Sequence, residues 1–85
     1  MRRGLVPSKG TAYFNGPRGR PLDIVAEVQP FLGHGHASIA LLTDGDEWYS
    51  AEVVFTGQAY IAYAVNGYSD RFSAEEDALK RGRLD

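Results

Sequence analysis

Two carboxylates and a phenol form the most suggestive group of side chains in this chain. Glu52, Tyr63 and Asp70 fall on three successive predicted strands, and the turns between these strands would place them in one row. Neighbouring strands are about 4.8 Å apart, so the carboxylates would be about 10 Å apart with the phenol between them. This spacing approaches that of an inverting glycosidase pair. The same row suits an arginine or lysine, because an aromatic ring also binds a cation. Since 85 residues leave little room for a substrate cleft, we interpret the row as a binding strip.

Two other segments have side chains that could bind a metal ion. His34 and His36 form an H-x-H motif, and imidazole suits zinc, copper or nickel. A site needs three or four ligands, and the motif specifies no third. Residues 43–47 resemble a calcium loop but lack its full spacing, so we interpret them as a hairpin turn. The chain also has no cysteine. We therefore predict neither a metal nor a cofactor, and no catalytic residue.

Charge is sorted by sign along the chain, although the net charge is only −2. Residues 21–70 contain no lysine or arginine, whereas the first twenty residues contain no acid. Such a negative block attracts positively charged surfaces and repels nucleic-acid phosphates. The carboxylates of this block are Asp23, Glu27, Asp44, Asp46, Glu47, Glu52 and Asp70, and the cations before it are Arg2, Arg3, Lys9, Arg18 and Arg20.

The length and composition predict one small domain, residues 1–85. A chain of this size buries only about 60% of its unfolded surface, so its stability is marginal without a further contribution. Disulfides are excluded by the lack of cysteine, which makes oligomerisation or a partner the expected contribution. There is no run of about 18 apolar residues and no apolar segment after Arg2 and Arg3. We expect no membrane span and no secretory signal, and hence a cytoplasmic protein.

The pattern of apolar residues and turns predicts an α+β fold, a curved antiparallel meander of about five strands followed by one short C-terminal helix. Residues 1–21 are rich in glycine, proline and arginine, and are expected to form a basic arm with one possible short strand at 11–15. The sheet is predicted over residues 22–72. Its strands are expected at 22–29, 38–43, 48–56, 59–65 and 68–72, with turns at 44–47, 57–58 and 66–67. Asn66-Gly67 is a strong hairpin signal, because a type I′ turn requires positive φ at both central residues.

A helix is predicted over residues 73–82. Ser73 and Glu76 have the spacing of a capping box, in which each side chain accepts from the other residue's backbone amide. Gly82 is a suitable stop. Ala74, Ala78 and Leu79 would form the apolar side of this helix.

The predicted register gives the sheet two apolar faces, and one short helix cannot cover both. We expect the helix on the face that carries the small residues, because alanines allow close approach. The other face could be covered by residues 1–35 closing a small barrel, by a second copy of the chain, or by a different protein. The first face contains Ala40, Leu42, Tyr49, Ala51, Val53, Phe55, Tyr60, Ala62 and Ala64, and the second contains Ile39, Leu41, Trp48, Glu52, Val54, Ile61, Tyr63, Val65, Tyr68, Asp70 and Phe72.

This architecture resembles that of small phage-encoded inhibitors, of which anti-CRISPR proteins are the best-known group. The resemblance covers residues 38–82, including Asn66-Gly67 and the segment that begins Phe72-Ser73 and continues to Glu76. It lies in size, acidity and arrangement of elements, and no motif is matched. It implies a protein that occupies a basic nucleic-acid-binding surface, or jams a nuclease complex, without catalysis. The basic segment at 1–20 departs from this pattern.

We therefore expect a non-enzymatic protein-binding module, a phage or mobile-element inhibitor that covers a basic surface of a partner complex. A homodimer is a further possibility. Aromatic anchors with a charged rim are typical of binding hot spots. The predicted contact residues are Asp44, Asp46, Glu47, Trp48, Glu52, Tyr63, Tyr68 and Asp70.

The alternative is a module that binds single-stranded nucleic acid. In that case the sheet aromatics would stack on bases, while Arg2, Arg3, Arg18 and Arg20 would follow the phosphates. The lack of any cation in residues 21–70 disfavours it, because stacked strands still need a positive groove. A third possibility is a small enzyme subunit whose site forms only at a dimer interface.

Overall fold

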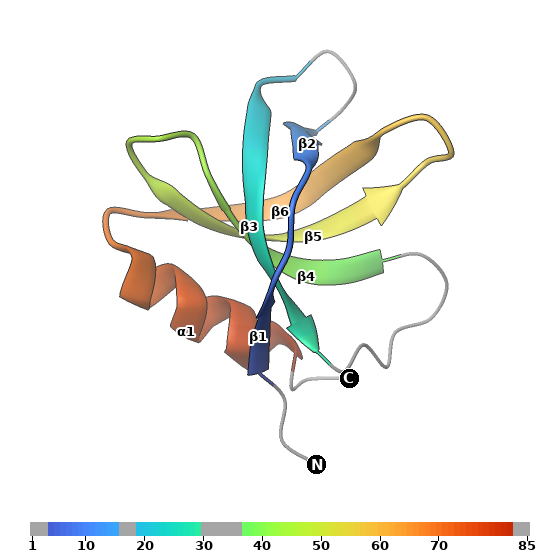
Figure 1. The fold of residues 1–85 in the computed structure, drawn as a ribbon. Helices are drawn as coiled ribbons and strands as arrows, with labels where there is room; N and C mark the ends of the chain where they lie inside the picture. Colours follow the sequence, from blue (N-terminus) through green and yellow to red (C-terminus); the bar gives the residue numbers. More distant parts are fainter. Residues whose placement is uncertain (1–3, 16–18, 30–36, 83–85) are drawn as a thin grey trace.

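The computed structural model describes residues 4–15, 19–29 and 37–82. These residues form six strands in one sheet and one helix (Figure 1). In chain order, the elements are β1 (Gly4–Pro7), β2 (Thr11–Phe14), β3 (Pro21–Gln29), β4 (Ala37–Thr43), β5 (Trp48–Phe55), β6 (Tyr60–Tyr68) and α1 (Arg71–Gly82). The predicted α+β fold, with a mainly antiparallel sheet and a C-terminal helix, is confirmed. Among the described residues, no helix has the length and apolar character needed to cross a membrane.

The sheet closes on itself into a small barrel. β3 pairs with β2 and with β4 in antiparallel fashion, β5 and β6 continue the meander, and β6 returns to β2. This closing contact is parallel, with Ala12 opposite Tyr60 and Phe14 opposite Ala62. Closure removes the sheet edges along these paired segments. Closure by the N-terminal part of the chain was one of the three predicted ways to cover the second face. It is present, but it encloses the alanine-rich face instead.

The N-terminal segment is more regular than the sequence indicated. The expected strand at 11–15 is present as β2, but β1 was not predicted. Residues 4–7 and 11–14 therefore belong to the sheet rather than to a separate arm. β1 and β2 lie one after the other along the same edge of β3, with Leu5 opposite Val28 and Ala12 opposite Leu22. Gly10 lies at the corner between the two strands, where its φ of 138° favours glycine.

A bulge in β3 divides its apolar residues between two cores. Ile24 pairs with Leu42, whereas Ala26 pairs with Leu41, so Val25 is an extra residue between them. Ile24 and Leu42 belong to the cluster inside the barrel, while Ala26 and Leu41 belong to the cluster under α1. The even-numbered residues of β3 therefore face the barrel interior before the bulge and the helix after it.

The hairpin predicted at Asn66-Gly67 is wrong, because β6 continues through both residues. Asn66 pairs with Ser50 and Gly67 with Tyr49 on the neighbouring strand. Positive φ occurs instead at Ala64, where it is 51° and the register with β5 shifts by one residue. The chain therefore forms a β-bulge at Ala64, and not the predicted turn at residues 66–67. The predicted strand at 68–72 is absent, since Tyr68 ends β6 and the helix begins at Arg71.

The barrel closed by β2 to β6 has little internal space, and alanines alternate in its interior with larger apolar residues. The predicted alanine face is this interior, and the prediction that α1 packs there is wrong. The interior cluster consists of Ala12, Leu22, Ile24, Ala40, Leu42, Tyr49, Ala51, Val53 and Ala62, with Phe14 and Val65 packed against it.

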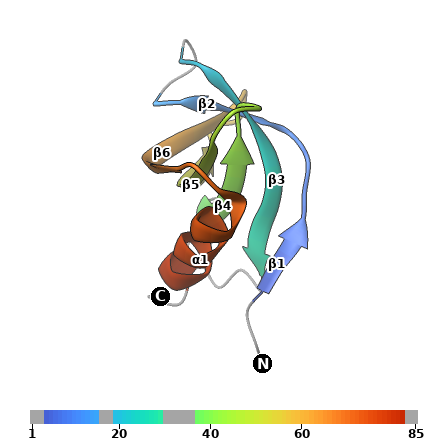
Figure 2. The same ribbon diagram turned by 90° about the vertical axis from the view of Figure 1, so that its left-hand side faces the viewer.

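The helix packs on the outer side of the barrel (Figure 2). Its buried residues Ala74, Ala78 and Gly82 are small, which brings α1 close to the strands. Ala74 packs in a cluster with Leu41, Trp48 and other residues of the sheet. The face that carries Leu41 and Trp48, which we expected to need a partner, is therefore partly covered by the chain's own helix.

The helix begins two residues earlier than predicted, and its cap is different. Asp70 is the N-cap residue, because its carboxylate accepts from the backbone amide of Ser73 at 2.9 Å and from the Ser73 hydroxyl at 3.0 Å. The predicted capping box of Ser73 and Glu76 is therefore wrong. Asp70 directly precedes the first helical residue, Arg71, which is the position of an N-cap residue.

Candidate functional site

The predicted row of two carboxylates and a phenol is reduced to one pair. Glu52 and Tyr63 lie directly opposite each other on β5 and β6, as predicted, and both are exposed. Asp70 does not face Tyr63, because β6 ends before it and its carboxylate caps α1. The arrangement of two acids with a phenol between them on three neighbouring strands is therefore not formed.

Apolar side chains flank this pair on the outer wall of the barrel. Ile39 pairs with Glu52 on β4, and Val54 is the next outward-facing residue of β5. Both are half-buried. α1 covers the neighbouring pair Leu41 and Ser50 on the same outer face. We call the uncovered residues Ile39, Glu52, Val54 and Tyr63 the outer patch. Glu52 is the only charged residue from position 48 to 68, so the patch is apolar and aromatic with one negative charge.

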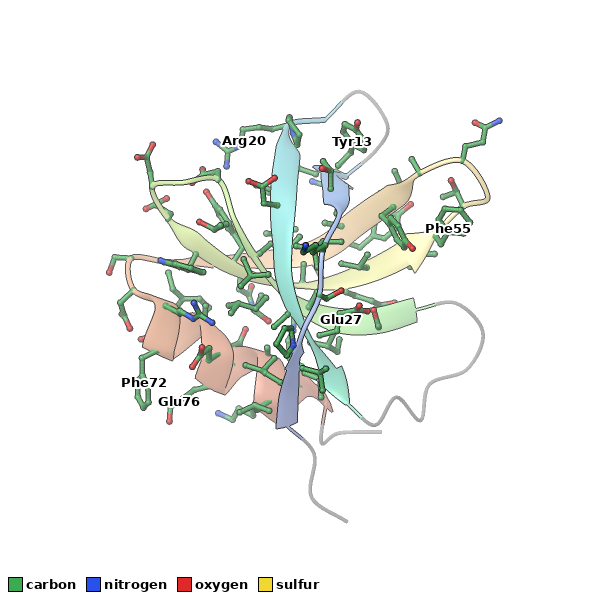
Figure 3. The ribbon with its side chains drawn as sticks, viewed as in Figure 1. Tyr13, Arg20, Glu27, Phe55, Phe72 and Glu76 are labelled. Atoms are coloured by element: carbon green, nitrogen blue, oxygen red, sulfur yellow. The ribbon has the colours of Figure 1, made fainter. Side chains whose placement is uncertain are left out.

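A second pair of exposed aromatic residues lies at the β5–β6 turn. Phe55 and Tyr60 are opposite each other, with ring centroids 4.9 Å apart and planes at 46°. Each is 43% exposed. By the alternation of the strands, they are on the same face as Val53 and Ala62, which point into the barrel. Phe55 lies at the end of β5, at the open end of the barrel (Figure 3). We call them the rim pair. From the sequence we assigned both residues to the alanine face. Only the closed barrel shows that this face is exposed to solvent at the β5–β6 turn.

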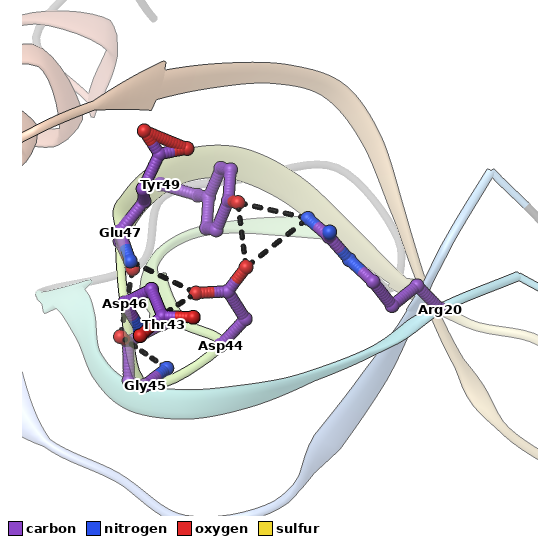
Figure 4. Close-up of polar contacts among 7 residues, drawn as sticks. All are labelled: Arg20, Thr43, Asp44, Gly45, Asp46, Glu47 and Tyr49. Atoms are coloured by element: carbon purple, nitrogen blue, oxygen red, sulfur yellow. Dashed lines mark hydrogen bonds and ion pairs between the residues drawn. The ribbon is translucent and has the colours of Figure 1, made fainter.

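Asp44 is engaged within the molecule. Its Oδ1 accepts from the backbone amides of Asp46 and Glu47 at 2.9 Å, and its Oδ2 accepts from the Tyr49 hydroxyl at 2.8 Å (Figure 4). Arg20 lies 3.3 Å from the same Oδ2. The hydrogen bonds from Glu47, Asp46 and Tyr49 lower the pKa of Asp44 to about 2. This predicted contact residue therefore stabilises the β4–β5 turn.

Arg20 is engaged at the same cluster. Its guanidinium donates to the Tyr49 hydroxyl at 2.8 Å and lies 5.7 Å from the centre of the Tyr49 ring. Burial and the hydrogen bond to Asp44 raise the pKa of Tyr49. Of the four arginines assigned to phosphate contacts in the alternative hypothesis, Arg20 has these internal partners. Arg2, Arg3 and Arg18 lie outside the described residues.

The other predicted contact residues are distributed along the length of β5. Asp46 and Glu47 are exposed at the β4–β5 turn. They are about 20 Å of strand away from Glu52 and Tyr63. Trp48 is half-buried, and the Arg71 guanidinium lies 5.2 Å from the centre of its ring. The predicted acidic and aromatic surface is therefore divided into an acidic turn, residues 44–47, and the outer patch.

Tyr68, also predicted as a contact residue, belongs to a polar network that joins α1 to β6. Asn66 donates to Asp77 at 3.1 Å, and Arg81 donates to Ser50 at 3.1 Å and to the carbonyl of Ala64. Burial and a hydrogen bond to Asp77 raise the pKa of Tyr68. Burial acts to raise the pKa of Asp77 as well, but hydrogen bonds from Asn66, Tyr68 and Ser50 outweigh it and lower this pKa. Sequence reasoning missed the network because it assigned Asn66 to a turn.

The two histidines considered as metal ligands, His34 and His36, lie outside the described residues. In the part of the chain that is described, no three His, Asp or Glu side chains come together as a ligand set for a metal ion.

No family model, curated protein or solved structure matches the chain.

Proposed function

We propose that the protein is a non-catalytic binding module that uses the outer patch and the rim pair to cover a basic surface of a partner protein. The observation that carries this proposal is the directly opposed, exposed pair of Glu52 and Tyr63. Residues 21–70 contain no lysine or arginine that could neutralise Glu52 from a neighbouring strand of the meander. The pair is therefore available to a cation from outside.

The chemistry of the patch favours an arginine or lysine of the partner. The carboxylate of Glu52 supplies charge-assisted hydrogen bonds, and the ring of Tyr63 offers a face to the same cation. Ile39 and Val54 would contact the aliphatic part of such a side chain. Phe55 and Tyr60 add aromatic surface at the barrel rim, and aromatic residues dominate binding hot spots.

A module of this kind acts as an inhibitor when the basic surface that it covers is one that binds nucleic acid. This is the mode implied by the resemblance to anti-CRISPR-type phage proteins, and we propose it for this chain, together with a cytoplasmic site of action. The acidic turn would strengthen the long-range attraction to such a surface, because exposed charges increase the rate of association more than the final affinity. The outer patch would then provide most of the binding energy.

The test uses purified guide-loaded CRISPR effector complexes and labelled target DNA. The wild-type protein is expected to reduce target binding by one of these complexes at a stoichiometric ratio. Tyr63→Ala and Glu52→Lys should each weaken this inhibition by about tenfold or more, since both belong to the proposed hot spot. Asp46→Lys, a charge reversal at an exposed position distant from the patch, is the matched control and should change mainly the salt dependence.

Two results would contradict the proposal. One is the absence of inhibition across the effector panel together with salt-sensitive binding of the protein itself to single-stranded DNA or RNA. That binding should be lost when Arg2, Arg3 and Arg18 are changed to alanine, and it would favour the nucleic-acid alternative. The other is inhibition that Tyr63→Ala and Glu52→Lys leave unchanged, which would exclude the outer patch as the contact surface.

A further inference from the structure

We propose that the solvent-facing side of α1 is an interface between two copies of this chain. The first observation is Phe72, which is 67% exposed and therefore the most exposed of the large hydrophobic residues that the structure describes. Phe72 and Glu76 are one helical turn apart and project from the same side of α1, away from the barrel (Figure 3). This surface is separate from the outer patch, so the inference does not depend on the proposed function.

A groove lies beside Phe72, between α1 and the end of β6. It has a volume of about 450 Å³ and contains both apolar and polar walls. Phe72 is not among its lining residues, so the ring does not fill the groove of its own molecule. The groove is lined by Tyr68, Ser73, Glu76, Asp77, Leu79 and Lys80.

When two copies are related by a two-fold axis, the projecting ring of one copy can face the groove of the other. Each Phe72 would enter the groove of the other copy, and each would pack against the ring of Tyr68 and the side chain of Leu79. A two-fold interface uses one patch on both molecules, so one complementary pair is satisfied twice. Burial of both rings removes the largest exposed apolar side chains of α1 from water.

The charges of this surface also fit a second copy. Glu76 and Lys80 are exposed, opposite in sign and one turn apart. In two antiparallel helices, Glu76 of one copy can approach Lys80 of the other. A uniformly basic partner would instead be repelled by Lys80, and a uniformly acidic one by Glu76. Mixed charges on one face therefore favour self-association over either kind of foreign surface.

The size of the surface sets the expected strength of the dimer. α1 has 12 residues and is about 18 Å long, so the interface is at the small end of specific interfaces. We expect a dissociation constant in the range of about 1 to 100 μM. Dimerisation would also add the stabilisation that a domain of 85 residues lacks.

Sedimentation velocity of the full chain tests the interface, over concentrations from about 1 μM to about 1 mM. The wild type is expected to shift from monomer to dimer across this range. Phe72→Ser should weaken the dimer by about tenfold or more, because it removes the ring from both copies. Tyr60→Ser is the matched control, since Tyr60 is also an exposed aromatic residue but lies at the barrel rim. Circular dichroism verifies that both variants remain folded.

Charge reversal provides a second measurement. Glu76→Lys and Lys80→Glu should each weaken the dimer, whereas the double variant should restore it, because the unlike pairs across the two-fold axis are regenerated. The proposal is overturned if the wild type is monomeric throughout the concentration range. It is also overturned if Phe72→Ser leaves the dimer intact, or if the double charge variant remains as weak as the single ones.

Discussion

The hydroxyl of Tyr49 donates a 2.8 Å hydrogen bond to Oδ2 of Asp44, and so connects the barrel interior to the turn between β4 and β5. Tyr49 is only 6% exposed, whereas Asp44 lies on the turn. Arg20, the residue before β3, contacts both side chains. One phenol, one carboxylate and one guanidinium thus join three segments of the chain, and the stability of this junction depends on the ionisation of Asp44.

This junction predicts a loss of stability in acid. The pKa of Asp44 is lowered from 3.8 to about 2 in the folded protein. Its stabilising contribution is therefore fully present above its unfolded pKa and is lost as the pH falls through the folded pKa. Asp70 and Asp77 have lowered pKa values and act in the same direction. Urea denaturation between pH 5 and about 2 should show a decline for the wild type and a shallower one for Asp44→Asn. Equal slopes would exclude Asp44 as a source of the acid sensitivity.

Gly82 is expected to be intolerant of any side chain. A Cβ atom at this position would lie 2.6 Å from Cγ1 of Val28, which is buried in β3. Gly82→Ala should therefore lower the free energy of unfolding by roughly 1 to 3 kcal/mol, despite the better helix propensity of alanine. Combining it with Val28→Ala should cost less than the sum of the two single changes. Gly4→Ala is the control, because no atom lies within 4 Å of its added Cβ. An unchanged stability for Gly82→Ala would contradict the close contact.

The observed helix cap distinguishes Asp70 from Glu76. Asp70→Ala should destabilise the protein and reduce its helical circular dichroism signal, because the backbone amide of Ser73 loses its acceptor. Asp70→Asn should retain most of the stability, since asparagine is an equally good N-cap residue. Glu76→Ala should have little effect. If Glu76→Ala is as harmful as Asp70→Ala, the capping box of Ser73 and Glu76 operates after all.

The bulge in β6 predicts a stabilising substitution. Ala64 has a φ of 51° and is exposed, so it occupies a left-handed conformation without burying its methyl group. Ala64→Gly should raise the free energy of unfolding by roughly 0.5 to 1 kcal/mol, because glycine adopts this conformation without the steric cost. Ala64→Val should lower it. Ala59→Gly, in the β5–β6 turn without positive φ, is the comparison and should give no gain. A gain at Ala59 alone would indicate that the effect is unrelated to φ.

Two hairpin registers could be read from the sequence because each depends on a short turn. Thr43 is opposite Trp48 and Leu41 opposite Ser50, as the 44–47 turn predicted. Val54 is opposite Ile61 and Glu52 opposite Tyr63, as the 57–58 turn predicted. Extending the register from the 57–58 turn would place Ser50 opposite Val65, but the bulge at Ala64 shifts its partner to Asn66. The register was predictable as far as local turn chemistry extended, and it failed where a long-range pairing imposed a bulge.

In the candidate site too, contacts set by a local turn were predictable and contacts set by long-range packing were not. The opposition of Glu52 and Tyr63 was predictable from one turn and the period-two alternation of a strand. The removal of Asp70 from the row was not, because the same carboxylate also makes a good helix cap and the choice depends on where β6 ends. No local sequence pattern indicated that Asp44 and Arg20 would form an ion pair.

The sequence by itself determined the order of most elements, the alternation of side chains along each strand and the turns that join β4, β5 and β6. These properties depend on residues a few positions apart. The tertiary structure decided that the alanine-rich face is enclosed, that α1 covers the outside, and that β3 serves two cores. Alternation states which residues share a face but not which face is inside. That choice depends on the closing contact between β2 and β6, about fifty residues apart in the chain, and on the bulges that make closure possible.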